Sequence, residues 1–217
     1  MNRRSTLATL ALTLSFSVFM NTPIPASTPA PSSTSPSPTP AQAQAVIGGG
    51  CFWCVEAVYE RVPGILSAES GYAGGTSVNP TYEEVSSGHG GHAEVVRLTY
   101  DPAKISYRKI LDLFWEAHDP TTLNRQGADS GPQYRSIILF GNEAEQKEAE
   151  ASKAAAQAKF KSPIVTEIVP LKTYYPAEKY HQDYYSNVGM RNPYNMVVIA
   201  PKLDKLEKKG LIPQKKP

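Results

Sequence analysis

The chain has 217 residues and a formal net charge of +2 at pH 7, with 22 Lys and Arg against 20 Asp and Glu. Many lysines gather between Lys202 and Lys216, and no strand interleaves basic with aromatic residues, so we expect no nucleic-acid partner. Two cysteines are too few for an all-cysteine zinc site, and the four histidines lack zinc-finger spacing. We therefore expect no bound metal.

The first 44 residues differ in composition from the rest of the chain. Arg3 and Arg4 precede the apolar run Leu7–Met20, which is the order of a secretory signal, and an uncharged Pro-, Ser- and Thr-rich linker follows. Cleavage after Ala26 is favoured over cleavage after Ala45, which would remove most of the next predicted strand. The alternative is an uncleaved anchor. We expect an exported protein, periplasmic or otherwise extracytoplasmic, with no stable membrane contact after cleavage.

One domain is predicted over residues 45–205, followed by a basic, flexible tail over 206–217. Hydrophobic periodicity and turn residues predict strands at 43–49, 65–72, 93–100, 135–140 and 164–169. Helices are predicted at 52–61, 81–86, after Ser106, at 143–160 and at 177–185. This order favours an α/β (α+β) two-layer sandwich, with helices packed on a ferredoxin-like mixed sheet and a long ordered C-terminal coil.

Both cysteines lie in Gly48–Glu56, where a glycine run joins the first predicted strand to the first predicted helix. Cys51 falls at the first turn of that helix, where unpaired amides and the helix dipole stabilise a thiolate. Cys54 lies one turn further on, within disulfide distance of Cys51. A disulfide that closes so short a loop stabilises a fold little, so the pair is better suited to a redox couple than to a structural disulfide. Phe52 and Trp53 are either an aromatic wall beside the nucleophile or simply core.

Three further residues carry weaker signals. Glu94 begins a strand that is otherwise apolar, so its carboxyl is either at an exposed strand mouth or desolvated with a raised pKa and able to donate a proton near neutrality. Tyr82 and Tyr134 lie among polar residues and glycines, where a phenol can donate a hydrogen bond into a cleft. Each can equally be a surface or packing residue.

Several short motifs occur together in one order along the chain. They are Gly-Cys-Phe-Trp (50–53), Ser-Gly-Tyr-Ala-Gly-Gly (70–75), Asn-Pro-Thr-Tyr (79–82), Gly-His-Ala-Glu (91–94), Phe-Trp-Glu-Ala-His-Asp-Pro (114–120), Asp-Ser-Gly-Pro-Gln-Tyr-Arg-Ser (129–136) and Tyr-His-Gln-Asp-Tyr (180–184). In this order they resemble the A-type methionine sulfoxide reductases, the peptide-methionine (S)-S-oxide reductases. The resemblance extends from Val46 to Lys202.

The resemblance implies a role for each candidate residue. Cys51 would attack the sulfoxide sulfur as a thiolate, and Glu94 would protonate the oxygen. Phe52 and Trp53 would hold the S-methyl group against aromatic faces. The products would be methionine and a sulfenic acid on Cys51.

The same resemblance assigns the polar contacts to the substrate. Tyr82 and Tyr134 would donate hydrogen bonds to the sulfoxide oxygen, stabilising the charge that grows there in the transition state. Asp129 would bind the substrate backbone or orient another group. Substrates would be oxidised proteins and peptides or free methionine sulfoxide, in the repair of oxidative damage. No bound cofactor is implied, and we expect a monomer.

The chain departs from much of that family in its cysteines. Many members resolve the sulfenic acid with C-terminal cysteines, whereas this chain has Asn195 where some relatives carry one. Our hypothesis is that Cys54 attacks the Cys51 sulfenic acid and that a thioredoxin-like donor reduces the resulting disulfide. Two other functions stay open: a general thiol–disulfide module, and a non-catalytic binder of oxidised peptides.

Overall fold

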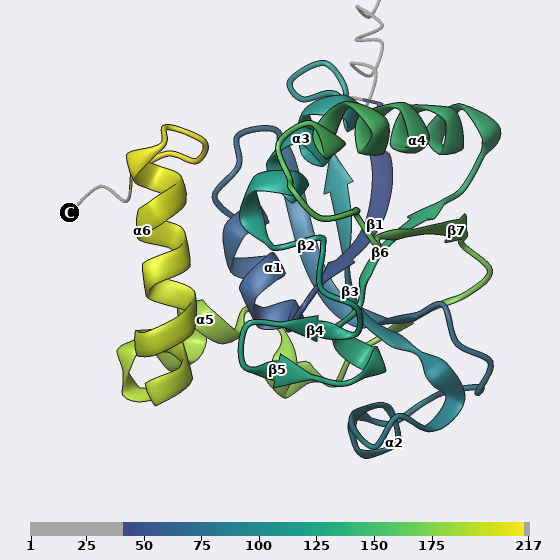
Figure 1. The fold of residues 1–217 in the computed structure, drawn as a ribbon. Coiled ribbons are helices and arrows are strands. Elements are labelled where there is room, and N and C mark those ends of the chain that lie inside the picture. Colours follow the sequence, from purple (N-terminus) through teal and green to yellow (C-terminus); the bar gives the residue numbers. More distant parts are fainter. Residues whose placement is uncertain (1–40, 215–217) are drawn as a thin grey trace, which may run out of the picture. The chain divides into compact units, whose positions relative to one another are not determined.

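A six-stranded sheet forms the centre of the computed structural model, which describes residues 41–214 (Figure 1). Its order is β7 (Glu167–Pro170), β6 (Ser136–Phe140), β1 (Ala43–Gly49), β3 (Ala93–Tyr100), β2 (Ile65–Ala73) and β8 (Tyr174–Pro176). Neighbouring strands are antiparallel except for the parallel pair β6–β7. The expected signal segment and most of the linker lie outside the described residues.

The middle of this sheet confirms the ferredoxin-like prediction. Helix α1 (Phe52–Tyr59) connects β1 to β2, and α3 (Tyr107–Ala117) connects β3 to β6. Four of the strands therefore run in the order β6-β1-β3-β2, the arrangement of a split β-α-β fold. Because β1 lies between β3 and β6, the segment that follows β1 emerges from the centre of the sheet. That segment holds Cys51.

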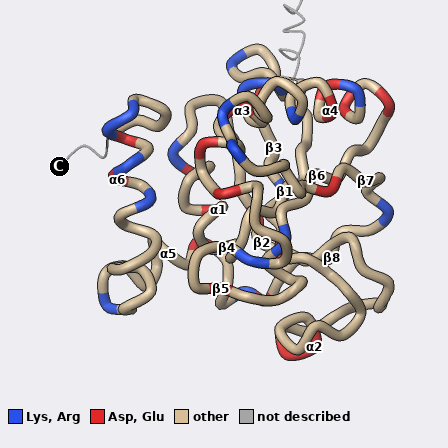
Figure 2. Tube along the Cα trace, viewed as in Figure 1, with Lys and Arg blue, Asp and Glu red and all other residues tan. Residues whose placement is uncertain are grey.

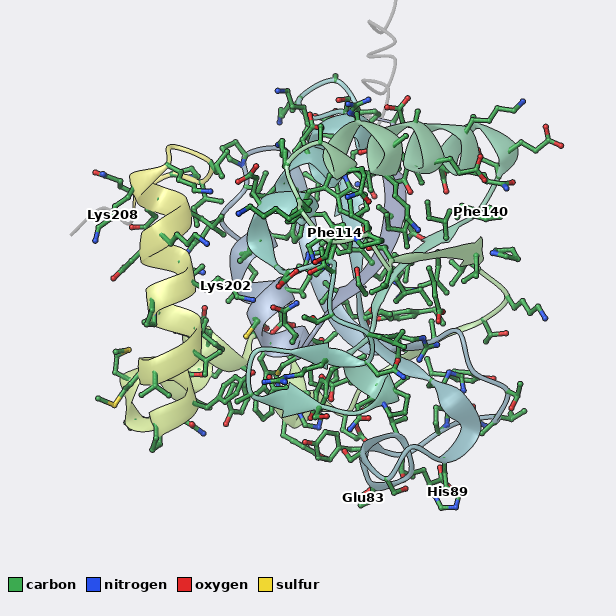
Figure 3. The ribbon with its side chains drawn as sticks, in the orientation of Figure 1. Glu83, His89, Phe114, Phe140, Lys202 and Lys208 are labelled. Carbon is green, nitrogen blue, oxygen red and sulfur yellow. The ribbon has the colours of Figure 1, made fainter. Side chains whose placement is uncertain are left out.

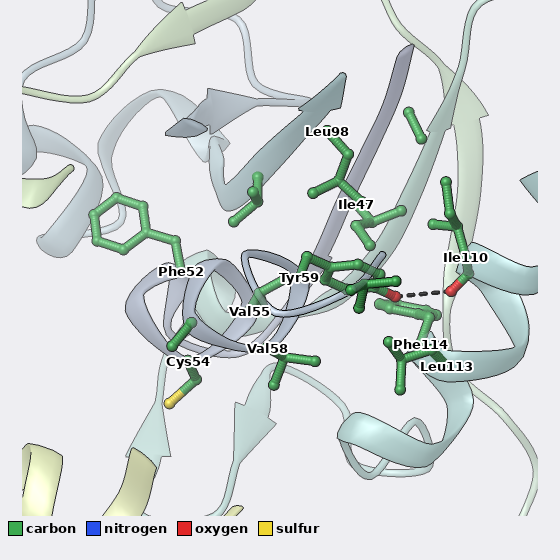
Figure 4. Close-up of a cluster of buried hydrophobic side chains, with 14 of the residues drawn as sticks. Ile47, Phe52, Cys54, Val55, Val58, Tyr59, Leu98, Ile110, Leu113 and Phe114 are labelled. Carbon is green, nitrogen blue, oxygen red and sulfur yellow. Dashed lines mark hydrogen bonds between the residues drawn. The ribbon is translucent and has the colours of Figure 1, made fainter. Parts of the chain in front are cut away.

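Side chains that alternate along the central strands supply apolar surface to both faces of the sheet. Ile47 belongs to the larger cluster, which α1, α3 and α4 (Glu143–Gln157) cover, whereas its neighbour Val46 belongs to a smaller cluster on the other face. The hydroxyl of Tyr59, on α1, donates to the carbonyl of Ile110, on α3, at 2.8 Å (Figure 4). The predicted two-layer packing of helices on a sheet is confirmed.

Gly48 is required by close packing at the centre of the sheet. A Cβ atom at this position would lie 2.6 Å from the carbonyl oxygen of Glu94 and 2.9 Å from Cγ2 of Ile137. We predict that Gly48→Ala lowers the free energy of unfolding by about 1–3 kcal/mol, the usual cost of overpacking a core. Urea unfolding measures the difference.

Gly141 offers the matched control for that substitution. A Cβ atom there would meet only the side chain of Glu145, at 3.5 Å. Gly141→Ala should therefore leave the unfolding midpoint close to the wild-type value, and equal midpoints for the two variants would contradict the packing explanation for Gly48.

The C-terminal segment contains more regular structure than the predicted coil. Strand β8 adds to the sheet, and α5 (Tyr184–Val188), a π-helix (Asn195–Ile199) and α6 (Ala200–Lys208) follow. The helix expected over 177–185 is not continuous, because Asp183 has the left-handed backbone conformation (φ 50°) between a 3₁₀ turn and α5. Sequence periodicity did not reveal these elements because each is short.

Ordered structure also continues past residue 205, where the sequence analysis ended the domain. Leu206 and Ile212 are buried, and the ammonium of Lys209 lies 2.8 Å from Glu116. Figure 2 shows the lysines of α6 in blue along this helix. The basic residues expected in a flexible tail therefore begin on a packed helix, whose buried leucines recur every three residues.

Smaller elements complete the fold. Helix α2 (Tyr82–Ser86) is capped by Thr81 and Glu84, and β4 (Arg125–Gln126) pairs with β5 (Asp129–Ser130). Helix α4 ends at Gln157, three residues before the predicted end, because this side chain accepts the Ile164 amide proton and closes the following loop. Across residues 41–214, no helix has the length and apolar character needed to cross a membrane.

Candidate active site

The junction between β1 and α1 sets the position of Cys51. Gly50 has φ +97°, a conformation that glycine adopts without strain, and it turns the chain from the strand into the helix. Cys51 is the N-cap residue of α1, and the amide of Phe52 donates to Oε2 of Glu94 at 3.0 Å. A carboxyl group from β3 thus satisfies the start of the helix, beside the thiol.

Glu94 is a buried carboxyl, 2% exposed, which decides between the two positions that the sequence left open. Burial raises its pKa to about 8, and the hydrogen bond from the Phe52 amide only partly opposes this shift. The carboxyl is therefore largely protonated at neutral pH. It can donate a proton to a group bound beside Cys51.

Cys51 does not have the stabilised thiolate that its position at a helix start predicted. The side chain is buried, and desolvation raises the pKa of the thiol, assisted by a hydrogen bond with Cys54 and by the nearby Glu94. A thiolate on Cys51 is therefore unfavourable while the site is empty. The sequence pattern located the helix start correctly, but the burial of the thiol depends on distant parts of the chain.

A cavity of about 200 Å³ joins the predicted residues. It is lined by Cys51, Phe52, Trp53, Tyr82, Glu94, Asp129, Tyr134 and Tyr194. Tyr82 enters from the start of α2 and Tyr134 from a 3₁₀ turn (Pro132–Tyr134) before β6. Desolvation raises the pKa of both phenols, so each retains the proton that it needs to act as a hydrogen-bond donor.

The aromatic side of the cavity is held by residues that the sequence analysis did not select. The ring of Trp53 stacks on Tyr184 with centroids 3.7 Å apart and planes 6° from parallel. Its indole N–H donates to Nδ1 of His181 at 3.1 Å. His181 also contacts the rings of Phe52 and Tyr82. Tyr184 and His181 both belong to the motif at 180–184, and this motif was the only sequence signal that could have identified them.

Cys54 is buried and does not line this cavity, and its sulfur points to a different side of α1 from the Phe52 ring (Figure 4). A hydrogen bond from Cys51 lowers its pKa to about 7, and the positive charge of Lys202 acts in the same direction. Lys202 reaches from α6 toward α1 (Figure 3). Both cysteines are free thiols in this structure.

Tyr194 is the remaining residue that sequence analysis missed. Its hydroxyl donates to Oδ2 of Asp129 at 2.7 Å and lies 3.6 Å from Sγ of Cys54. Among residues 41–214, no group of three or more His, Cys, Asp or Glu side chains is arranged so that it could hold a metal ion. A buried thiol, a protonated carboxyl and two phenol donors around one cavity define a thiol-based enzyme.

Comparison with known proteins identifies the family. The family model described as peptide methionine sulfoxide reductase matches residues 43–214. The protein named peptide methionine sulfoxide reductase MsrA from Saccharolobus solfataricus is 52% identical over 171 residues, which are 79% of this chain and 95% of that relative. MsrA from Leptospira borgpetersenii is 53% identical over 166 residues, 76% of this chain and 94% of the relative.

Solved structures agree with this assignment. Reduced Mxr1 from Saccharomyces cerevisiae is similar with a TM-score of 0.66 and 35% identity, covering 69% of this chain and 87% of Mxr1. Methionine sulfoxide reductase A of Corynebacterium diphtheriae has a TM-score of 0.62 and 34% identity, covering 69% and 76% of the two chains. The chain belongs to the peptide methionine sulfoxide reductase family, in its A type, and is a peptide-methionine (S)-S-oxide reductase.

Proposed function

We propose that Cys51 attacks the sulfur of methionine sulfoxide while Glu94 protonates its oxygen. The observation that carries this proposal is the single cavity that holds a thiol, a protonated carboxyl and two phenol donors. Tyr82 and Tyr134 donate hydrogen bonds to the oxygen as negative charge develops on it. The oxygen then transfers from the substrate sulfur to the Cys51 sulfur as the transient bond between the two sulfurs breaks, so that methionine leaves and Cys51 becomes a sulfenic acid.

The proton balance of this step explains the raised pKa values. The reactive state has a proton on Glu94 and none on Cys51, and that proton ends on the oxygen of the sulfenic acid. Because burial disfavours the charged forms of both groups, the pair holds at least one proton at neutral pH. When the oxygen of a bound sulfoxide takes the Glu94 proton, the sulfoxide sulfur becomes more positively polarised. This favours attack by the Cys51 thiolate beside it.

The size of the cavity limits what enters it. About 200 Å³ is below the usual range of roughly 300–1,000 Å³ for a pocket that encloses a whole ligand. We propose that only the sulfoxide end of the side chain is buried, with its methyl group against Phe52 and Trp53, while the backbone stays outside near Asp129. Free and protein-bound methionine sulfoxide would then both be substrates.

Recycling is proposed to use Cys54. In the reduced protein a hydrogen bond from Cys51 lowers the pKa of the Cys54 thiol to about 7, and Cys54 lies one turn from Cys51. Attack on the sulfenic acid gives a Cys51–Cys54 disulfide. A thioredoxin-like dithiol would reduce this disulfide and restore both thiols.

Assay of the two epimers of a methionine sulfoxide ester with dithiothreitol tests the proposed reaction. We expect turnover of the S epimer only, and none in Cys51→Ser. Exchange with client disulfides without loss of sulfoxide would instead support a general thiol–disulfide module. Binding of oxidised peptides without turnover would support a non-catalytic binder.

We propose in addition that the protein is exported and that its N-terminal segment is removed. The charge and hydrophobicity of the first residues support this proposal. N-terminal sequencing of protein recovered from the extracytoplasmic fraction is expected to begin after Ala26. A start at Met1 in the membrane fraction would contradict cleavage, and recovery from the cytoplasm would contradict export.

A further inference from the structure

A continuous chain of polar groups connects the second thiol to the active-site cavity. Sγ of Cys54 lies 3.6 Å from the hydroxyl of Tyr194, and this hydroxyl donates to Oδ2 of Asp129 at 2.7 Å. Since the tyrosine proton points at the carboxylate, the oxygen lone pairs are free to accept the S–H of Cys54. Asp129 and Tyr194 also line the cavity that contains Cys51.

The position of Tyr194 is fixed from several directions. Its amide donates to Oδ1 of Asn192 at 2.7 Å, and Nδ2 of Asn192 donates to the hydroxyl of Tyr184 at 2.7 Å. The ring of Tyr194 meets Trp53 edge-on, with centroids 6.0 Å apart and planes at 76°. The hydroxyl is therefore held against Cys54 by a segment more than a hundred residues away in sequence.

We propose that Tyr194 and Asp129 carry the Cys54 proton to the oxygen that leaves Cys51 when the disulfide forms. This inference rests on the proposed role of Cys54 as the resolving thiol. Sulfenic acid and thiol give a disulfide and water, so one proton must move from the Cys54 sulfur to the departing oxygen. The Tyr194–Asp129 pair connects the Cys54 sulfur with the cavity that Cys51 lines, where the oxygen leaves.

The step balances without any added reactant. The Cys54 sulfur supplies the electron pair of the new S–S bond, and the electron pair of the breaking S–O bond leaves with the oxygen of the sulfenic acid. The Cys54 proton passes to Tyr194 as the tyrosine proton passes to Asp129. Asp129 then protonates the departing hydroxide, so that water leaves and the carboxylate is restored. The Cys51 sulfur is reduced as it passes from the sulfenic acid to the disulfide, and the Cys54 sulfur is oxidised by the same amount. The step therefore needs no external oxidant or reductant.

Tyr194→Phe tests this role because it keeps the aromatic ring and removes only the hydroxyl. In a single turnover, quenched samples give methionine by chromatography and the Cys51–Cys54 disulfide by peptide mapping. We expect the full equivalent of methionine but a disulfide that forms about tenfold or more slowly, the effect of losing a hydrogen bond to a charged group. Sulfenic acid, trapped by dimedone, should persist meanwhile.

The pH dependence of disulfide formation separates this role from a structural one. Disulfide formation needs the Tyr194–Asp129 pair where Cys54 still carries its proton, and it needs no such transfer where Cys54 is already ionised. Tyr194→Phe should therefore slow disulfide formation most at low pH and progressively less as the pH rises through the pKa of Cys54. A substitution that merely loosened packing would slow the reaction by the same factor at every pH.

Two further variants keep the test decisive. Tyr185→Phe removes a hydroxyl whose contact is the sulfur of Met190, and it should leave both rates unchanged. Asp129→Asn breaks the same connection while keeping Tyr194, and it should also slow disulfide formation. Disulfide formation at the wild-type rate in both Tyr194→Phe and Asp129→Asn would overturn the proposal. If the wild type forms methionine but no Cys51–Cys54 disulfide, the resolving role of Cys54 itself fails.

Discussion

Glu94→Gln is expected to slow methionine formation about 10²- to 10⁴-fold in a single turnover, the usual contribution of a positioned general acid. Glutamine cannot supply the proton that the sulfoxide oxygen takes up as its bond to sulfur breaks. It does keep a side-chain oxygen for the Phe52 amide, which Glu94 accepts at 3.0 Å, so the start of α1 should remain intact. Rapid quenching followed by chromatography of methionine measures the rate.

The pH profile should change in form as well as in height. The wild type needs one proton on Glu94 and none on Cys51, so its single-turnover rate is expected to be bell-shaped. The rising limb lies at about pH 8, where the pair loses its first proton, and the falling limb follows the loss of the second at higher pH. With Glu94 replaced, only Cys51 titrates, and the rate should rise without a falling limb.

Two outcomes would contradict the acid role of Glu94. One is a Glu94→Gln enzyme as fast as the wild type. The other is a slow variant that keeps the bell-shaped profile, because the loss would then come from distorted geometry rather than from the missing proton. A melting temperature close to that of the wild type serves as the control for folding, since the glutamine preserves the Phe52 contact.

The parts of the site that sequence could predict are those with a local signal. The glycine run, the change of period and the two cysteines placed Cys51 at a helix start, where the structure has it. The ionisation of Cys51 could not be predicted in the same way. The helix start favours a thiolate, but burial by surrounding segments opposes it and raises the pKa.

The missed residues share a different property. Tyr194, Tyr184 and His181 reach the site from a C-terminal segment whose elements are too short to show periodicity. Tyr194 lies 140 positions from Cys54 and His181 lies 128 from Trp53, so nothing near α1 in the sequence points to either contact. In a chain with many tyrosines, only the packed fold distinguishes those that line the cavity.

Cys54→Ser is expected to form about one equivalent of methionine in the first turnover and then to lose thioredoxin-linked turnover. The first step needs only groups that line the cavity, and Cys54 is not among them. Without Cys54 the sulfenic acid has no thiol partner in the chain, because Cys51 and Cys54 are its only cysteines. Methionine yield per enzyme, measured with and without a thioredoxin system, gives both quantities.

Comparison with Cys54→Ala separates the chemistry of the sulfur from its hydrogen bonds. Serine keeps a hydroxyl that can contact Tyr194, which lies 3.6 Å from the Cys54 sulfur, and alanine does not. If recycling requires a second thiol, the two variants should fail equally with thioredoxin. Small thiols such as dithiothreitol should restore turnover in both, since they can attack the sulfenic acid directly. Unimpaired thioredoxin-linked turnover in either variant would show that the reductant reaches Cys51 itself, and Cys54 would then have no part in the catalytic cycle.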